Sequence, residues 1–187
     1  MAEKRKNWNG LISGFSASDL VFLDESGCNT DMTRRYAYSF GGSRAVDATP
    51  LSKPKNTTIL SSIQLNGTLH YTTFLGGTTV ERFKQYLESD LLPHLDGNSV
   101  LIMDNMKSHH AKAVKNLLDS SGIRYIYLPP YSPDLNPIEK LWSKVKAFLR
   151  KFKARTLDTL PNAVQRAFQT VSPSDCSGWF KSCDYLH

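Results

Sequence analysis

The sequence predicts an α/β domain in which parallel strands are flanked by helices. Two observations support this fold class. Short apolar runs that end in an acid, at 20–24 and 98–104, are typical of buried strands. Amphipathic stretches with helical spacing, at 79–92 and 109–120, alternate with such strands along the chain. A length of 187 residues suits one domain with a sizeable core.

Local signals set the order of the elements. Aromatic and β-branched residues favour strands at 36–40 and 57–65, and the Asn-Gly pair at 66–67 indicates a hairpin turn. Thr78 is predicted to cap the first helix, and Pro93 is predicted to end it. The predicted elements, in chain order, are strands at 20–24, 36–40, 57–65 and 68–75, a helix at 79–92, a strand at 98–104, a helix at 109–120, a strand at 123–128, and helices at 137–153 and 157–170.

The composition is that of a soluble globular protein, with 40% hydrophobic and 21% charged residues. No apolar run reaches the roughly 20 residues that a membrane helix needs, and no secretory signal segment follows the basic N-terminus. The three cysteines form neither a disulfide framework nor a zinc-binding spacing, so we expect free thiols in a reducing compartment. These features predict an intracellular, cytoplasmic protein.

The net charge of +6 is concentrated near the C-terminus. From Pro137 onward, nine Lys or Arg residues stand against four Asp or Glu residues, whereas the charges before that point nearly cancel. This asymmetry indicates a surface that faces a polyanion. A solvated helix face is the alternative explanation.

Two acids, Asp24 and Asp104, follow buried strands at their carboxyl ends. In open α/β sheets this edge binds ligands. Two carboxylates brought together there repel each other and lose hydration, unless a cation bridges them. Two interpretations fit: a site for a hard divalent cation, which prefers oxygen ligands, or two acids that each cap the turn that follows.

Glu139 is the third candidate acid. Asn136 and Pro137 have the residue types of a helix cap and a first helical position, which would make Glu139 the acidic member of a capping box. The proline-rich loop at 129–137 is stiff and would fix the start of this helix near the strand ends. Glu139 could therefore serve the cap or point toward Asp24 and Asp104, and both roles compete for the same oxygens.

Three stretches carry a family resemblance: Phe22-Leu-Asp-Glu-Ser-Gly27, then Leu101-Ile-Met-Asp-Asn105 with His109-His110, then Leu128-Pro-Pro-Tyr-Ser-Pro-Asp-Leu-Asn-Pro-Ile-Glu-Lys-Leu-Trp142. With these motifs the chain resembles the DDE transposases of the mariner-like superfamily, in particular its bacterial insertion-sequence branch. The 34 residues between Asp104 and Glu139 match the spacing of that family. The stretch 178–185 is also similar to the family's C-terminal end.

The resemblance implies a ribonuclease-H-like fold, with a mixed five-stranded sheet flanked by helices, for a catalytic domain at 20–187 after an N-terminal extension at 1–19. It implies that Asp24, Asp104 and Glu139 form the catalytic triad and ligate two divalent ions, Mg²⁺ with Mn²⁺ as a substitute. The expected reaction is cleavage of DNA at transposon ends and strand transfer to target DNA, by in-line phosphodiester displacement. Matching motif positions of supporting rank are Asn105, His109 and Asn136, and Glu25 is expected to be a supporting or surface acid.

Members of that family usually carry helix-turn-helix modules before the first catalytic Asp, whereas 23 residues precede Asp24 here. The chain is then either the downstream half of a frameshifted pair of reading frames or a truncated copy. Expected partners are transposon-end and target DNA, a second copy of the chain, and an upstream helix-turn-helix polypeptide or fusion. Two alternatives remain open: an idle transposase fragment or DNA-binding accessory subunit, and another ribonuclease-H-like nuclease.

The basic helix that begins at 137 is predicted to contact the DNA backbone, because its charged side chains fall away from its apolar stripe. Its affinity is expected to fall as the salt concentration rises. The predicted DNA-binding residues are Lys140, Lys144, Lys146, Arg150, Lys151 and Lys153.

Overall fold

The computed structural model describes residues 2–34, 36–51 and 54–186, without the side chains of 2–6. Its strands are β1 (Leu20–Cys28), β2 (Thr57–Gln64), β3 (Leu69–Leu75), β4 (Val100–Met103) and β5 (Arg124–Tyr127). Its α-helices are α1 (Ala2–Ile12), α2 (Val80–Tyr86), α3 (Lys112–Ser121), α4 (Ile138–Phe152), α5 (Leu160–Gln169) and α6 (Pro173–Ser182). None of these helices is both long and apolar enough to cross a lipid bilayer, within the described residues.

The five strands form one mixed sheet in the order β3-β2-β1-β4-β5. β1 pairs with β2, and β2 with β3, in antiparallel fashion, through the hairpin predicted from the Asn-Gly pair at 66–67. β4 and β5 add to β1 in parallel, since helical crossovers carry the chain between them. The predicted mixed five-stranded sheet is confirmed.

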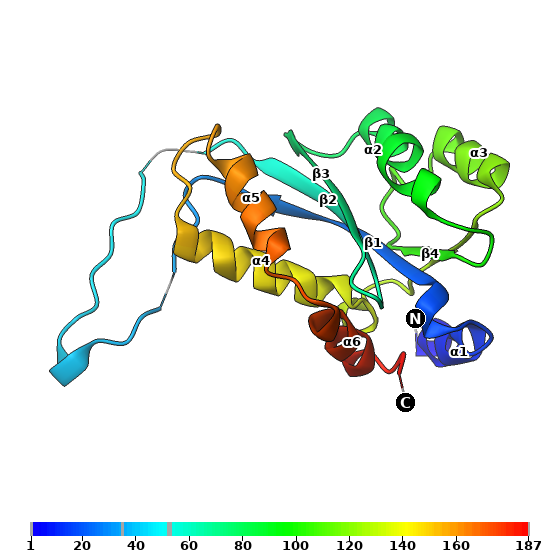
Figure 1. Ribbon diagram of the computed structural model, residues 1–187, viewed down its shortest axis with the longest axis horizontal. Helices are drawn as coiled ribbons and strands as arrows, with labels where there is room; N and C mark the ends of the chain where they lie inside the picture. The colour runs from blue at the N-terminus through cyan, green and yellow to red at the C-terminus, as the bar shows by residue number, and fades with distance from the viewer. Residues whose placement is uncertain (1, 35, 52–53, 187) are drawn as a thin grey trace.

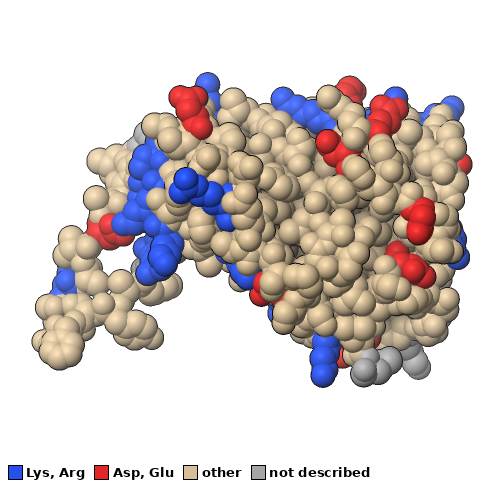
Figure 2. Space-filling model, in the orientation of Figure 1, with Lys and Arg blue, Asp and Glu red and all other residues tan. Residues whose placement is uncertain are grey.

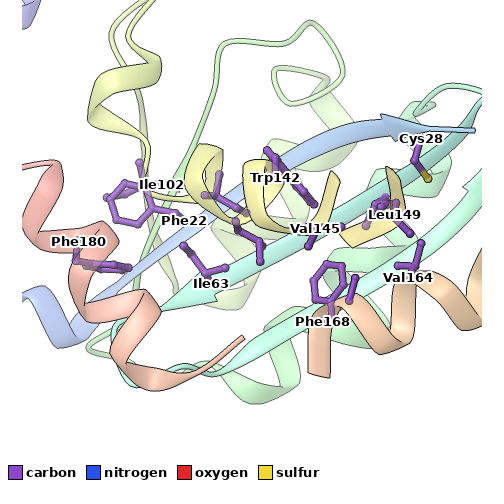
Figure 3. Packing of buried hydrophobic residues seen from close by; sticks show 14 of the residues in the cluster. Phe22, Cys28, Ile63, Ile102, Trp142, Val145, Leu149, Val164, Phe168 and Phe180 are labelled. Atoms are coloured by element: carbon purple, nitrogen blue, oxygen red, sulfur yellow. The ribbon is translucent and has the colours of Figure 1, made fainter. Parts of the chain in front are cut away.

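Successive side chains of β1 point to opposite faces of the sheet, and each face has its own core. Phe22 packs on one face with the apolar residues of α4, α5 and α6, including Trp142 and Phe168 (Figure 3). Val21 and Leu23 pack on the other face, against α2 and α3. Figure 1 shows the two groups of helices on opposite sides of the sheet. The strands are therefore buried on both faces, which explains their nearly continuous apolar sequences.

The segment predicted as a strand at 36–40 is not a strand. It lies in a long excursion between β1 and β2 that extends away from the body of the molecule (Figure 1). Tyr36, Tyr38 and Phe40 are 91%, 107% and 100% exposed, respectively. Aromatic residues favour strands because a sheet buries them, and here no sheet neighbour does so. The local composition was therefore misleading.

The boundaries of several helices differ from the predictions. Thr79, rather than Thr78, caps α2 by accepting a hydrogen bond from the Arg82 N–H, and α2 passes into a π-helical turn at Leu87–Leu91. α3 begins at Lys112, three residues later than predicted, and is ended by Gly122 in a left-handed conformation.

α6 was not predicted, although its N-terminus carries a clear sequence signal. The Ser172 hydroxyl accepts from the Asp175 N–H, and the Asp175 carboxylate accepts from the Ser172 N–H. This reciprocal pair is a capping box, with Pro173 in the first turn. The same signal is visible in the sequence.

The extension predicted at 1–19 contributes a helix, α1, that packs on the main core. Trp8 and Ile12 are buried with Phe22 in the same hydrophobic cluster. The Trp8 indole N–H donates to the Tyr185 hydroxyl, with 3.0 Å between the two atoms, and Tyr185 in turn donates to the Leu135 carbonyl. This chain of bonds joins the two ends of the chain to the loop that precedes α4.

We predict that Trp8→Ala lowers the free energy of unfolding by about 3–5 kcal/mol, because it removes a buried aromatic side chain. Leu11→Ala, on the same helix, is the control: Leu11 is 52% exposed, and its truncation should cost less than about 1 kcal/mol. Urea denaturation of both variants measures the difference. Equal, small losses would show that α1 is not part of the cooperative core.

Candidate active site

The pairing of β1 with β4 brings two of the predicted acids together. Leu23 pairs with Met103 in the parallel register, so Asp24 and Asp104 are the next residues on the two strands. β4 ends at Met103 whereas β1 continues, which opens the sheet edge beside Asp24. Both acids line one cavity of about 450 Å³, together with Glu139 from the first turn of α4. The structure thus brings together the three residues predicted as the catalytic triad.

Asp24 is held by donors from α4 and the loop before it. The Trp142 indole N–H donates to Asp24 Oδ2 at 3.1 Å, and the Asn136 side-chain amide donates to the same oxygen at 3.5 Å. Burial raises the pKa of Asp24 to about 7, and the charges of Asp104 and Glu139 act in the same direction. Hydrogen bonds from Trp142 and the Glu25 backbone oppose this rise. Asp24 is therefore a carboxylate whose charge the apoprotein disfavours.

Asp104 is held by the turn that follows β4. Its Oδ1 lies 2.9 Å from His109 Nδ1 and accepts a hydrogen bond from the Met106 N–H at 3.0 Å. Burial alone would raise the pKa of Asp104, but these hydrogen bonds and the charge of His109 lower it below its usual value. In contrast to Asp24, Asp104 stays ionised in the folded protein.

His109 is fully buried, and a second acid lies on its other side. Its Nε2 is 3.2 Å from Glu25 Oε1. Burial alone would lower the pKa of His109, but its hydrogen bonds to Asp104 and Glu25 raise it to about 9. The ring is therefore an imidazolium at neutral pH, and both of its nitrogens carry protons. His109 thus contacts the acid of β1 that follows Asp24 and the predicted catalytic acid Asp104.

Of the two roles that the sequence leaves open for Glu139, the capping box does not form. The residue that precedes α4 is Pro137, and no side chain caps this helix. The Asn136 amide instead turns toward Asp24. Glu139 is exposed and lines the cavity, so its carboxylate is available to a ligand there. Asn136 hydrogen-bonds to Asp24 rather than capping α4, so the capping role of Glu139 is lost and the cavity role is left.

Asn105 supports the loop that forms the cavity wall. Its amide nitrogen donates to the Leu128 carbonyl, and its Oδ1 lies 3.3 Å from His110 Nε2. Leu128 N–H also donates to the Met103 carbonyl, which keeps the proline-rich loop against the end of β4. Tyr131 in this loop has a positive φ of 56° and is 87% exposed beside the acids.

The donor set fits a divalent cation. All three acids supply carboxylate oxygens, and the side-chain donors to each aspartate fall on one oxygen of the pair. Asn136, which lines the same cavity, has a buried Oδ1 without a hydrogen-bond partner among the described residues. Within the described residues, no three such side chains converge closely enough to form a ready metal cluster. The acids share a cavity in which water or substrate oxygens would complete the coordination.

Sequence reasoning missed the role of Trp142, which it assigned to the apolar stripe of α4. The side chain is 3% exposed and does pack in the core, but its N–H reaches Asp24. A buried Trp needs an acceptor for its N–H, and Trp142 lies one turn after Glu139. That spacing could have indicated an acidic partner.

The predicted DNA-binding residues divide into two groups. Lys144 pairs with Asp175 of α6 and Lys153 pairs with Asp47 of the β1–β2 excursion, each with 2.6 Å between nitrogen and oxygen. The other four have no salt bridge within the described part of the chain; they are Lys140, Lys146, Arg150 and Lys151. Basic side chains gather where the excursion leaves the body (Figure 2).

A sequence profile described as DDE superfamily endonuclease matches residues 19–161, which include all three acids. The chain belongs to the DDE superfamily of endonucleases. The predicted membership of the DDE superfamily is thereby confirmed, and the insertion-sequence branch stays a prediction. No curated protein matches this DDE endonuclease in sequence.

Solved structures of Mos1 mariner transposase share the fold of this DDE endonuclease. The Mos1 catalytic domain has a TM-score of 0.73 and 17% identity, over 97% of this chain and 86% of that one. For the Mos1 paired-end complex with Mn the TM-score is 0.80 and the identity is 20%, over 96% of this chain and 58% of that one. For the pre-cleavage Mos1 transpososome the TM-score is 0.78 and the identity is 19%, over 97% of this chain and 60% of that one. This chain thus spans about 60% of the Mos1 chains in those complexes, and the predicted ribonuclease-H-like fold is confirmed.

We predict that the stability of the metal-free protein falls relative to Asp24→Asn as the pH rises from about 4 to about 7. The folded-state pKa of Asp24, about 7, lies above its ordinary value of 3.8, so ionisation in this interval opposes folding. The difference in unfolding free energy between the two proteins should grow by about 2 kcal/mol or more.

Urea denaturation in EDTA at pH 4.5 and 7.5 measures this difference. Asp158→Asn, at an exposed position, is the control. Its difference in unfolding free energy from wild type should be the same at both pH values. Parallel pH profiles for wild type and Asp24→Asn would contradict the assignment of Asp24 as a buried, charge-disfavoured acid.

Proposed function

We propose that this chain is the catalytic part of a DDE transposase, which cleaves DNA at transposon ends and transfers the cut strand to target DNA. The observation that carries the proposal is the gathering of Asp24, Asp104 and Glu139 around one cavity, in a chain of the DDE endonuclease family. The proposal extends to a pair of Mg²⁺ ions as the cofactor, with Mn²⁺ as a substitute. DNA as the substrate favours a cytoplasmic location with the nucleoid.

Each residue of the cavity has a defined task in this proposal. Asp24, Asp104 and Glu139 would hold the metals, whose chemistry, when they are bound, is to stabilise charge on the attacking and leaving oxygens. Trp142 and Asn136 fix one oxygen of Asp24, and His109 and the Met106 N–H fix one oxygen of Asp104. Both of these contacts to Asp104 fall on Oδ1, which leaves Asp104 Oδ2 for a ligand. No serine or tyrosine is required as a nucleophile, because water or a DNA 3′-OH attacks in line.

The basic residues near the end of α4 would hold the DNA backbone. Lys146 and Arg150 line a cavity of about 390 Å³ at the base of the β1–β2 excursion. Lys151 lines a neighbouring cavity together with Arg34. Lys146, Arg150 and Lys151 lie on the same helix as Glu139. This helix begins at the acids, so α4 connects the binding surface to them. Contacts to phosphates position DNA without reading its sequence.

A second copy of the chain is the protein partner that we favour. The β1–β2 excursion exposes large apolar side chains, including Tyr36, Tyr38, Phe40 and Leu51, which monomeric surfaces rarely present together. The structures named as Mos1 paired-end complexes share this fold. An upstream helix-turn-helix polypeptide or fusion would supply the sequence-specific recognition of transposon ends, which the basic surface of α4 does not provide.

We predict that the chain nicks supercoiled DNA in the presence of Mg²⁺ or Mn²⁺, and that Asp104→Asn lowers the rate at least about 100-fold. Asp104→Asn keeps the size of the side chain but removes a charged metal ligand. Asp158→Asn is the matched control at an exposed position and should keep the wild-type rate. Equal nicking by wild type and Asp104→Asn would mean that another centre or a contaminant cuts the DNA.

We also predict that DNA affinity depends on salt through the end of α4. The double variant Lys146→Gln/Arg150→Gln is made in the Asp104→Asn background, which should not cleave the DNA. It removes two phosphate contacts, so the slope of log affinity against log salt should become smaller in magnitude by about 1.8. Fluorescence anisotropy with a labelled duplex measures the slope. Lys84→Gln, on the opposite face of the sheet in an ion pair with Glu88, should leave the slope unchanged. An unchanged slope in the double variant would place the DNA elsewhere.

A further inference from the structure

Glu25 follows Asp24 on β1 but faces the other side of the sheet. Alternate strand residues point to opposite faces, so Asp24 meets α4 whereas Glu25 meets the segments before α2 and α3. Asp24 lines the cavity, and Glu25 does not. The Glu25 side chain is nevertheless only 10% exposed, and burial of an acid away from a ligand site requires a partner.

Glu25 has two partners, one for each oxygen. The Thr78 hydroxyl donates to Oε2 at 2.5 Å, and His109 Nε2 lies 3.2 Å from Oε1. The other ring nitrogen of His109 lies 2.9 Å from Asp104 Oδ1. A continuous series of contacts therefore runs from Thr78 through Glu25 and His109 to Asp104. This series, Thr78–Glu25–His109–Asp104, is called the buttress below.

We propose that Glu25 is a positioning residue for Asp104, acting through His109 and anchored by Thr78. The buttress fixes Asp104 Oδ1 from the face of the sheet opposite α4, and so leaves Oδ2 for a divalent cation in the cavity. The inference rests on the proposed function, in which Asp104 binds a metal. It assigns a task to the acid that directly follows the first catalytic Asp.

The geometry around His109 explains how it can transmit position. Its ring is fully buried and stacks on Phe83, with 4.2 Å between the ring centroids and 26° between the planes. The Tyr127 hydroxyl donates to the His109 backbone carbonyl at 3.0 Å, which holds the main chain. A ring clamped in this way cannot tilt without breaking a contact at one end. A shift of Glu25 is therefore passed to Asp104.

Two other tasks for His109 fit the geometry less well. As a metal ligand it would need a free ring nitrogen, but both nitrogens face carboxylates. As a plain core residue it would need no charged partner on either side. Outer partners that orient a metal-binding side chain typically change metal affinity 10- to 100-fold when they are removed.

The experiment measures Mn²⁺ affinity in the absence of DNA, by the EPR signal of free Mn²⁺. Glu25→Gln should weaken Mn²⁺ binding 10- to 100-fold, and Thr78→Val should weaken it by a smaller factor. His109→Phe keeps the stacking on Phe83 but removes both contacts to the acids, and it should weaken binding at least as much as Glu25→Gln. Glu81→Gln, an exposed acid at the start of α2, is the control and should bind Mn²⁺ as wild type does.

The double variant Glu25→Gln/His109→Phe tests whether Glu25 acts through His109. If it does, adding Glu25→Gln to His109→Phe causes no further loss of Mn²⁺ affinity. A full additional loss would mean that Glu25 acts by its charge across space, and would overturn the proposal. Thermal unfolding without metal reports whether each variant folds, and His109→Gln replaces His109→Phe if the latter does not.

The outcome for Asp104→Asn separates this inference from the proposed function. If Asp104→Asn binds Mn²⁺ as wild type does, Asp104 is not a metal ligand and both proposals fail. If Asp104→Asn loses Mn²⁺ but Glu25→Gln binds it normally, the metal site stands and the buttress is overturned. Loss in both, with the non-additive double variant, is the result that we expect.

Discussion

The mutual repulsion of three carboxylates at one edge of the sheet is the constraint on which the rest of the site depends. The parallel register of β1 and β4 makes Asp24 and Asp104 neighbours, and the start of α4 adds Glu139 to the same cavity. Without a cation the charged form of Asp24 is unfavourable, because burial above all raises its pKa to about 7 and the charges of Asp104 and Glu139 act in the same direction. A cation placed between the carboxylates would offset this cost.

The protein stabilises this edge from both faces of the sheet. On one face, α4 and the loop before it supply Trp142 and Asn136 as donors to Asp24. On the other face, Glu25 and Thr78 reach Asp104 through the ring of His109. The two aspartates therefore have opposite electrostatic states in the apoprotein: Asp24 is pushed toward its neutral form, whereas Asp104 is kept ionised. A cation entering the cavity would meet Asp104 as the ready ligand.

The sequence predicted the parts of this site that depend on strand ends and motif spacing. Asp24 and Asp104 were found because an acid after an apolar strand marks the carboxyl edge of a sheet. Glu139 was left with two possible roles, and the capping box does not form because Asn136 bonds to Asp24 instead. Local patterns could not show that choice, since the competing partner lies 112 residues away.

Other features depended on contacts that a sequence window does not contain. The aromatic run at 36–40 resembles a strand, but the excursion that carries it has no sheet neighbour to bury it. The buttress joins residues as far as 84 positions apart, on a face of β1 that only the fold identifies. In contrast, α6 carried a visible capping box and could have been predicted.

The most direct test of the central claim is a crystal structure of this chain soaked with Mn²⁺, with anomalous differences used to locate the metal. We expect anomalous peaks in the cavity, with carboxylate oxygens of Asp24, Asp104 and Glu139 as ligands and Asp104 Oδ2 among them. Peaks that lie outside this cavity, or a cavity without bound metal at saturating Mn²⁺, would contradict it.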